Sequence, residues 1–262
     1  MVNKFETEYL TKARSILWTG NQREGRNGVT ASLPFQTLMF DLRDGLPLMT
    51  TRKSYYKGVF GEYAALIRGP QHIDDFTKWG CNFWKKWAQP DGTINLDYGN
   101  AWVDFHGENQ METVLNLLKN DYTDRRMLIT GWDPSNLKNV DLPCCHYSYQ
   151  FWSDGKHLDL LWTQRSGDWM IGVPADALLA SAMVNQFASL ANMIPRNVTM
   201  MIGDAHIYED HWEATREQTS RKPFDMPLYA YKTQQDLYSF EPDDFVVKHY
   251  EHHPAIDYLL KA

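Results

Sequence analysis

Apolar residues recur at helical spacing in three parts of the chain. Residues 5–17 and 55–67 each place them on one side of a helix, so the pattern predicts two amphipathic helices. Glu62 lies among the apolar positions of the second of these stretches. Residues 177–193 are apolar on almost every side, which predicts a helix that runs through the core rather than over the surface.

Other segments favour extended structure. Residues 35–42, 147–152 and 157–164 suit strands, and the last two are joined by the turn-forming sequence Ser-Asp-Gly-Lys. Residues 20–28 (GNQREGRNG) are rich in Gly, Asn and charge, so we expect a mobile loop there. Neither a repeat nor a linker interrupts the pattern. The sequence therefore predicts one domain over 1–262, of α+β class, with a mixed sheet packed with helices.

Composition and charge limit what such a domain binds. The 262 residues are 43% hydrophobic, and the formal net charge of -7 provides no general basic surface for nucleic acid. An anionic metabolite is the expected ligand. Three cysteines (Cys81, Cys144 and Cys145) are an odd number, which is typical of a reduced compartment, and no stretch approaches the ~18 apolar residues of a membrane span. We therefore expect a cytoplasmic protein with no membrane partner.

Two neighbouring segments carry candidate chemistry. Cys145 is followed by His146 at the start of a predicted strand, and a thiol attacks only as its thiolate, which cationic neighbours favour. Arg165, Ser166 and Asp168 place a guanidinium, a hydroxyl and a carboxylate in one turn, which suits an oxyanion or a phosphate. Taken alone, each has an ordinary alternative: an inert buried cysteine, and an ion pair at a strand end.

Two further segments are equally ambiguous when taken alone. His206 and Tyr208 lie two residues apart in an extended segment, so both point to one side, as two donors to a sugar hydroxyl could. Arg125 and Arg126 precede an apolar strand, and the simple interpretation is a solvated turn. Structural His and Tyr residues and exposed Arg residues are common. The combination of segments therefore carries the argument.

Together and in this order, the segments resemble the thymidylate synthase family over nearly the whole chain. Many motifs match at compatible spacing, which makes the resemblance specific. The matching segments are Phe40–Arg52 (FDLRDGLPLMTTR), Glu62, Trp84–Trp87, Tyr98-Gly99, Asp124-Arg125-Arg126, Pro143–Phe151, Gln164–Pro174, Gly203–Tyr208 and His253-Pro254.

The resemblance implies a role for each matching position. Cys145 would be the nucleophile that adds to ring carbon 6 of a pyrimidine nucleotide, and Arg165 would favour its thiolate and contact the phosphate. Glu62, His146 and Tyr98 would handle protons. The other implied nucleotide ligands are Arg26 (or Arg23) on the phosphate loop, Arg125 and Arg126 reaching into a partner subunit, Gln164, Ser166, Asp168, Asp176, His206 and Tyr208. The implied folate contacts are Trp84, Asp168, Ile171, Gly172, Ala175 and Ala262.

The same resemblance implies a homodimer formed through the sheet, with sites shared between subunits. It also implies 5,10-methylenetetrahydrofolate as cosubstrate and no metal.

One departure from the family pattern concerns the base. Ala175 and Asp176 stand where thymidylate synthases have a phenylalanine and an asparagine. An Asn amide matches the acceptor and donor of uracil, whereas a carboxyl accepts from the exocyclic amine of cytosine and, when protonated, donates to nitrogen 3. This Asn-to-Asp change is associated with the deoxycytidylate hydroxymethylases of bacteriophages. The sequence therefore favours dCMP, with CMP left open, and a host-cytoplasm location if a phage encodes the chain.

The expected reaction divides after the one-carbon transfer. Thiolate addition makes carbon 5 nucleophilic, and loss of its proton leaves an exocyclic methylene. Water then gives a hydroxymethyl group, whereas hydride gives a methyl group. Ala175 favours water and Trp84 favours a dry site. We expect 5-hydroxymethyl-dCMP and tetrahydrofolate; the alternatives are a dCMP methyltransferase, a thymidylate synthase, and a silent homologue that binds nucleotide or RNA.

Overall fold

The computed structural model describes residues 3–261 of the chain. The α-helices are α1 (Lys4–Thr19), α2 (Tyr56–Leu66), α3 (Ile73–Thr77), α4 (Asn100–Val103), α5 (Gln110–Asn120), α6 (Gly172–Leu190) and α7 (Trp212–Ser220). The strands are β1 (Asn21–Gly25), β2 (Gly28–Asp41), β3 (Leu128–Thr130), β4 (His146–Ser153), β5 (His157–Asp168), β6 (Ile194–Tyr208), β7 (Leu228–Tyr231) and β8 (Phe245–Lys248). Three 3-10 turns are η1 (Phe83–Lys86), η2 (Glu209–His211) and η3 (Pro242–Asp244).

Six strands form one mixed sheet in the order β1-β2-β6-β5-β4-β3. Strands β5 and β6 pair in parallel and the other neighbours pair antiparallel. A parallel pair needs a crossover, and α6 supplies it between β5 and β6. The predicted α+β class with a mixed sheet packed with helices is therefore confirmed.

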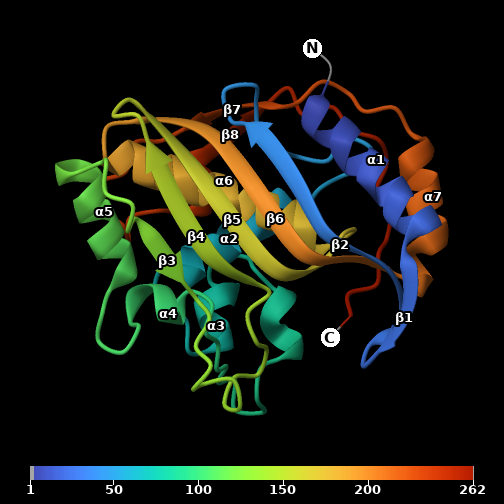
Figure 1. Ribbon diagram of the computed structural model, residues 1–262, viewed down its shortest axis with the longest axis horizontal. Helices are drawn as coiled ribbons and strands as arrows, with labels where there is room; N and C mark the ends of the chain where they lie inside the picture. The colour runs from blue at the N-terminus through green and yellow to red at the C-terminus, as the bar shows by residue number, and fades with distance from the viewer. Residues whose placement is uncertain (1–2, 262) are drawn as a thin grey trace.

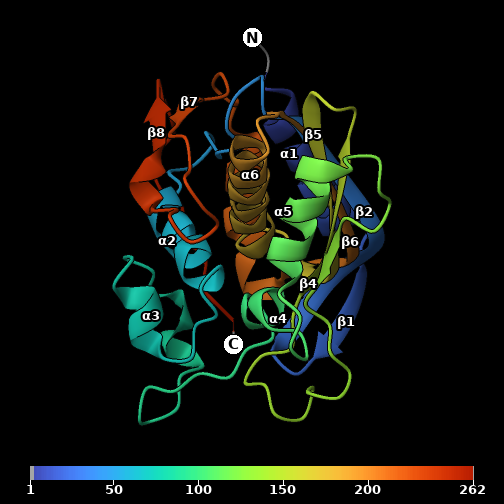
Figure 2. The same cartoon turned by 90° about the vertical axis from the view of Figure 1, so that its left-hand side faces the viewer.

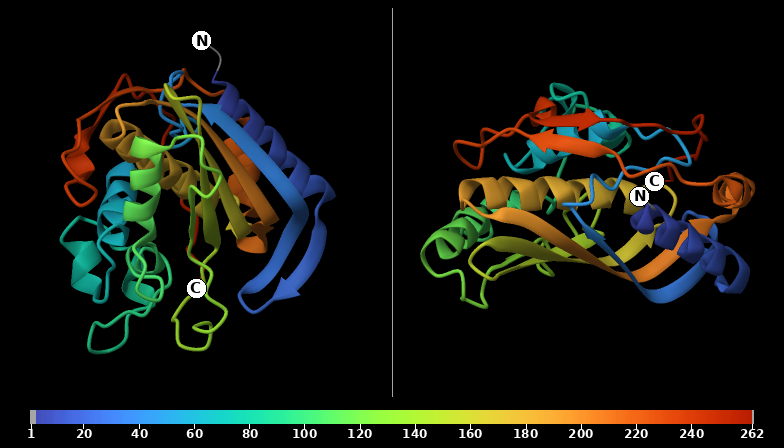
Figure 3. Two further views of the ribbon diagram at one scale, coloured as in Figure 1. Left: turned by 60° about the vertical axis from the view of Figure 1, so that its left-hand side comes forward. Right: turned by 90° about the horizontal axis from the view of Figure 1, so that it is seen from above.

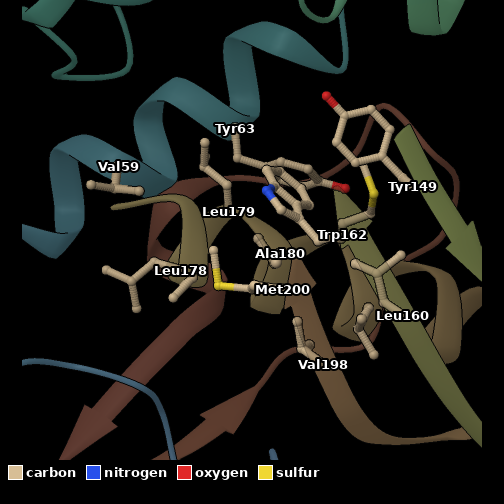
Figure 4. Packing of buried hydrophobic residues seen from close by; sticks show 14 of the residues in the cluster. Val59, Tyr63, Tyr149, Leu160, Trp162, Leu178, Leu179, Ala180, Val198 and Met200 are labelled. Atoms are coloured by element: carbon tan, nitrogen blue, oxygen red, sulfur yellow. The ribbon is translucent and has the colours of Figure 1, made fainter. Parts of the chain in front are cut away.

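The core lies between the sheet and α6, as Figure 3 shows in its view from above. Alternate residues of each strand point to this side, so the buried side chains form rows across the sheet. One such row is Ile129, Tyr149, Trp162, Met200 and Leu38, each of them fully or almost fully buried. Leu178 and Leu179 of α6 meet this layer, and Val59 and Tyr63 of α2 cover α6 on its other side (Figure 4).

On the opposite face of the sheet, no helix formed by residues 3–261 lies in front of the strands (Figure 1). The intervening residues of the same strands point there, in a continuous register row of Leu128, Gln150, Leu161, Thr199 and Met39. Large apolar side chains are exposed on this face: Met39 is 61% exposed and Trp152 is 57% exposed. Water thus contacts a broad, partly apolar surface in the isolated chain.

Two predictions were wrong: the loop over residues 20–28 and the start of the core helix. Residues 20–28 are not an irregular loop: β1 pairs with β2 from Asn21↔Ser32 to Gly25↔Gly28, as a hairpin that projects beyond the sheet (Figure 2). Every residue of β1 is exposed, so backbone pairing rather than apolar burial holds it, and no side-chain pattern announces it. Helix α6 begins at Gly172, five residues before the predicted start; Pro174 is compatible with its first turn because an N–H there has no intrahelical acceptor.

Within residues 3–261, no helix is long and apolar enough to cross a membrane.

Candidate active site

The candidate residues gather at one end of the sheet. Strand β4 begins at His146 and runs antiparallel to β5, so its first residues lie beside the last residues of β5, and the parallel strand β6 ends there as well. His146 pairs with Gln164 in the register, and Asp168 pairs with His206. The start of α6 follows directly from β5. The topology therefore brings together four of the segments singled out in the sequence.

Cys145 precedes β4 and is half-buried. Its backbone N–H donates to Tyr98 Oη at 2.7 Å, and its carbonyl accepts from the Arg165 N–H at 2.8 Å. The Arg165 guanidinium donates to the carbonyls of Cys144 (2.7 Å) and Pro143 (2.9 Å) and reaches Cys145 Sγ at 3.9 Å. The predicted neighbours of the thiol thus surround it.

The thiol is not ionised by these neighbours in the free protein. Burial raises the pKa of Cys145, and Asp176 and Asp168 raise it further, whereas Arg165 and the hydrogen bond with Tyr98 lower it. Burial has the larger effect. Arg165 therefore acts in the expected direction, and a further change, such as the arrival of the substrate, is needed to favour the thiolate.

Glu62 is the candidate proton carrier. It is buried in α2, and its Oε1 accepts from the Trp84 indole N–H at 2.8 Å. Burial raises the pKa of Glu62 to about 7, against which the Trp84 hydrogen bond works. A carboxyl with such a pKa both holds and releases a proton near neutrality. Tyr98 is buried with its pKa raised well above the ordinary value by burial, so its hydroxyl stays protonated.

His146 is buried and neutral, since burial lowers its pKa to about 3. Its Nδ1 lies 2.5 Å from Tyr149 Oη, and that hydroxyl donates to the His146 carbonyl at 3.0 Å. Sequence reasoning missed Tyr149, because residues three apart in a regular strand face opposite sides. A β-bulge between His146 and Ser148 shifts the phase by one residue, so both side chains face the core.

Asp176 lies in the early turns of α6, with its side chain buried beside β5. Its Oδ2 accepts from Gln164 Nε2 at 2.6 Å, and its Oδ1 is 3.8 Å from His146 Nε2. Burial raises the pKa of Asp176 well above its usual range, and the negative charges of Glu62 and Asp168 add to the effect. These surroundings favour the protonated form of the carboxyl, which has one hydrogen-bond donor and one acceptor.

The sugar and phosphate candidates lie on β6 and the β1–β2 hairpin. The rings of His206 and Tyr208 are in edge-to-face contact at 5.2 Å between centroids. Burial is the largest single effect on the pKa of His206 and lowers it, but the hydrogen bonds with Asp204 and the negative charges of Asp168 and Asp204 together give a net upward shift. Arg23 forms an ion pair with Asp204 at 2.5 Å. Arg26 has no carboxylate partner among residues 3–261. Its positive charge lowers the pKa of Tyr208, although burial raises that pKa overall. Of the two arginines on the hairpin, Arg26 is therefore the one available to bind a phosphate.

The predicted folate residues lie around the β5–α6 junction. Asp168 Oδ1 accepts from the backbone N–H groups of Met170 (2.9 Å) and Ile171 (3.2 Å), which fixes the turn into the helix. The other predicted folate residues that the structure describes are half-buried Ile171, Gly172 and Ala175 and buried Trp84; Ser166, a predicted nucleotide ligand, is half-buried on β5 nearby.

Two groups of predicted residues do not join this cluster. Arg125 and Arg126 are exposed before β3, and Arg126 is paired with Asp124. Ala262 lies outside the described residues.

Comparison with known proteins decides the family. A family model described as thymidylate synthase matches residues 7–261. A thymidylate synthase of Corynebacterium aurimucosum is 34% identical over 263 residues, 98% of each chain, and one of Mycoplasma pneumoniae is 30% identical over 279 residues, 95% of this chain and 97% of the relative. The chain belongs to the thymidylate synthase family. Membership implies a one-carbon transferase of nucleotide biosynthesis that uses methylenetetrahydrofolate.

The comparisons also bear on the finer expectations. Both relatives are named thymidylate synthase, so the names favour thymidylate synthesis over the expected hydroxymethylation of dCMP. Among residues 3–261, no cluster of three or more His, Cys, Asp or Glu side chains could hold a metal ion.

Proposed function

We propose that the chain transfers a one-carbon unit to ring carbon 5 of a cytosine nucleoside monophosphate, with Cys145 as the nucleophile. The Arg165 guanidinium, at 3.9 Å from Sγ, promotes the thiolate once a nucleotide is bound. Glu62, with its pKa of about 7, then holds or releases the proton that the ring exchanges. His206 and Tyr208 hold the sugar and Arg26 holds the phosphate.

The burial of the Asp176 carboxyl beside Gln164 and His146, which favours its protonated form, is the single observation that carries the choice of base. A neutral carboxyl has one donor and one acceptor, which match nitrogen 3 and the exocyclic amine of cytosine. A carboxylate that has lost this proton opposes oxygen 4 of uracil with like polarity, whereas it still accepts from the exocyclic amine of cytosine. The adjacent Gln164 Oε1 is buried and has no partner among the described residues, so it is a further acceptor for an amine.

The residues present fit a reduced folate. Half-buried Ala175 and Ile171 offer an apolar surface at the start of α6, and the indole of Trp84 lies beside Glu62. Methylenetetrahydrofolate supplies the one-carbon unit when bound. The small side chain of Ala175 leaves room for water on this side of the site, which supports a hydroxymethyl product and a dCMP hydroxymethyltransferase activity.

We also propose a homodimer that buries the open face of the sheet. Leu128, Met39, Met201 and Trp152 are each at least 44% exposed there, and a surface of this kind is typical of an interface. Pairing two such faces would leave Arg125 and Arg126, at the strand edge, free to serve the neighbouring site.

Thymidylate synthesis from dUMP is the second candidate, favoured by the names of the relatives. One assay separates the two. The protein is incubated with methylenetetrahydrofolate and, separately, dCMP, CMP and dUMP, and the products are weighed by mass spectrometry. A gain of one hydroxymethyl group on a cytosine nucleotide supports the proposal. A gain of one methyl group on dUMP, with dihydrofolate absorbance and no cytosine turnover, overturns it.

A further inference from the structure

The hydroxyl of Tyr149 has one proton and two close partners. It lies 3.0 Å from the His146 carbonyl and 2.5 Å from His146 Nδ1. With the hydroxyl proton in its hydrogen bond to the carbonyl, the Tyr149 oxygen is left to accept from Nδ1–H. The buried imidazole is neutral, with a pKa of about 3, and therefore carries a single N–H. That proton is on Nδ1, and Nε2 is a bare acceptor.

The unprotonated Nε2 atom of His146 lies near Asp176, the residue proposed to recognise the base. His146 Nε2 is 3.8 Å from Asp176 Oδ1. An ionised carboxylate there would place two lone-pair groups against each other, whereas a protonated carboxyl meets an acceptor. The tautomer of His146 thus favours the neutral form of Asp176, in the same direction as its burial.

We propose that Tyr149 is a positioning residue that holds His146 as the Nδ1–H tautomer and thereby keeps Asp176 protonated for cytosine. The consequence for cytosine rests on the proposed function; the tautomer does not. Other elements also face these groups. The groups around Asp176 are Glu62 from α2, Gln164 and Asp168 from β5, and Cys145. The groups around His146 are the uncharged aromatic rings of Tyr98, Trp102 and Trp162.

The variant Tyr149→Phe keeps the ring, which packs edge-to-face on Trp102 and Trp162, and removes only the hydroxyl. The Nδ1 proton then loses its acceptor, and the Nε2–H tautomer becomes competitive because it donates to Asp176. Such a donor stabilises the carboxylate and lowers the pKa of Asp176. Tyr63→Phe is the matched control: it also removes a buried hydroxyl bonded at 2.5 Å, but to Gln186, ten residues and about 15 Å along α6 from Asp176.

The primary test is nitrogen NMR of protein labelled at histidine, with His146 assigned by comparison with His146→Asn. Wild type and Tyr63→Phe should show a protonated Nδ1 and a bare Nε2, and Tyr149→Phe should shift population to the other tautomer. Protonated Nε2 in wild type, or an unchanged tautomer in Tyr149→Phe, overturns the proposal. This measurement needs no turnover, so it stands even if the proposed reaction fails.

The second readout is the pH profile of kcat/KM with dCMP. Because the active form of Asp176 is protonated, the high-pH loss of activity should move to lower pH in Tyr149→Phe, with a fall of about 10- to 100-fold at pH 8 and little change at pH 6. Tyr63→Phe should leave the profile in place. Equal losses at both pH values in Tyr149→Phe would show a structural role only and overturn the link to Asp176.

Discussion

Replacing Asp176 by asparagine exchanges a neutral carboxyl for an amide of the same shape in the base site. The Gln164 donor at 2.6 Å is satisfied by either side chain, and the amide nitrogen would take the place of Oδ1, 3.8 Å from His146 Nε2. The fold should therefore tolerate the change. What reverses is the pair of hydrogen bonds to the base: an amide donates to oxygen 4 and accepts from the nitrogen 3 proton of uracil, and mismatches cytosine at both positions.

The magnitude follows from those two pairs. Each mismatched buried pair costs on the order of 1–3 kcal/mol, and about 1.4 kcal/mol is a factor of ten. The ratio of kcat/KM for dCMP to that for dUMP should fall by about two to four powers of ten in Asp176→Asn. Product formation followed by mass spectrometry at saturating folate gives both constants. A wild-type enzyme that uses dUMP faster than dCMP and CMP, or a variant with an unchanged ratio, refutes the assignment of Asp176.

Acidity provides a separate check on the same residue. Because burial raises the pKa of Asp176, wild-type activity on a cytosine nucleotide should be full below that pKa and fall as the pH rises through it. The asparagine variant has no such group. Its residual activity on cytosine should lack this high-pH loss, and an identical pH profile would assign the loss to another group.

Further outcomes are expected elsewhere in the chain. Cys145→Ala should abolish turnover while nucleotide binding persists in calorimetry, and Cys144→Ala should be mild; full activity in the first variant removes the mechanism. Light scattering should show a dimer, and a monomer would contradict shared sites. An Arg125/Arg126 double variant mixed with Cys145→Ala should regain partial activity, because each heterodimer contains one intact shared site. Glu62→Gln should be more stable than wild type above pH 7 by up to about 3 kcal/mol in denaturant titrations. The advantage of the variant should fade below about pH 4.5, because the raised pKa of Glu62 makes the wild type lose stability only as the pH rises. A stability difference that does not change with pH would show that Glu62 does not titrate in this range.

Most of the sheet and the core helices could be predicted because burial imposes a period on the sequence. The strands near residues 147–152 and 157–164 and the helix that became α6 each bury a face, and each was found within a few residues. Strand β1 was missed because all five of its residues are exposed. A strand held only by backbone pairing leaves no apolar signature.

The site was predictable from the resemblance but not from local pattern. Cys145, Arg165, Tyr98 and Asp176 come from four segments far apart in the chain, and only the fold brings them together. The charge state of Asp176 was left open by the sequence, because it depends on burial and on the nearby Glu62. The contact of Tyr149 with His146 could not be predicted from the sequence, because the bulge that brings the two side chains to the same face depends on pairing between strands.

The β-bulge divides β4 into a part that packs in the core and an end that contributes to the candidate active site. From Tyr149 onward, β4 alternates between core and surface in step with β5, and this phase fixes the packing against α6. Before the bulge, one additional residue resets the phase, so His146 turns inward at the end where the chemistry lies. Without the bulge, the same sequence in regular alternation would turn His146 outward onto the open face of the sheet. The bulge therefore sets the orientation of the reactive end of β4 separately from that of the part packed against α6.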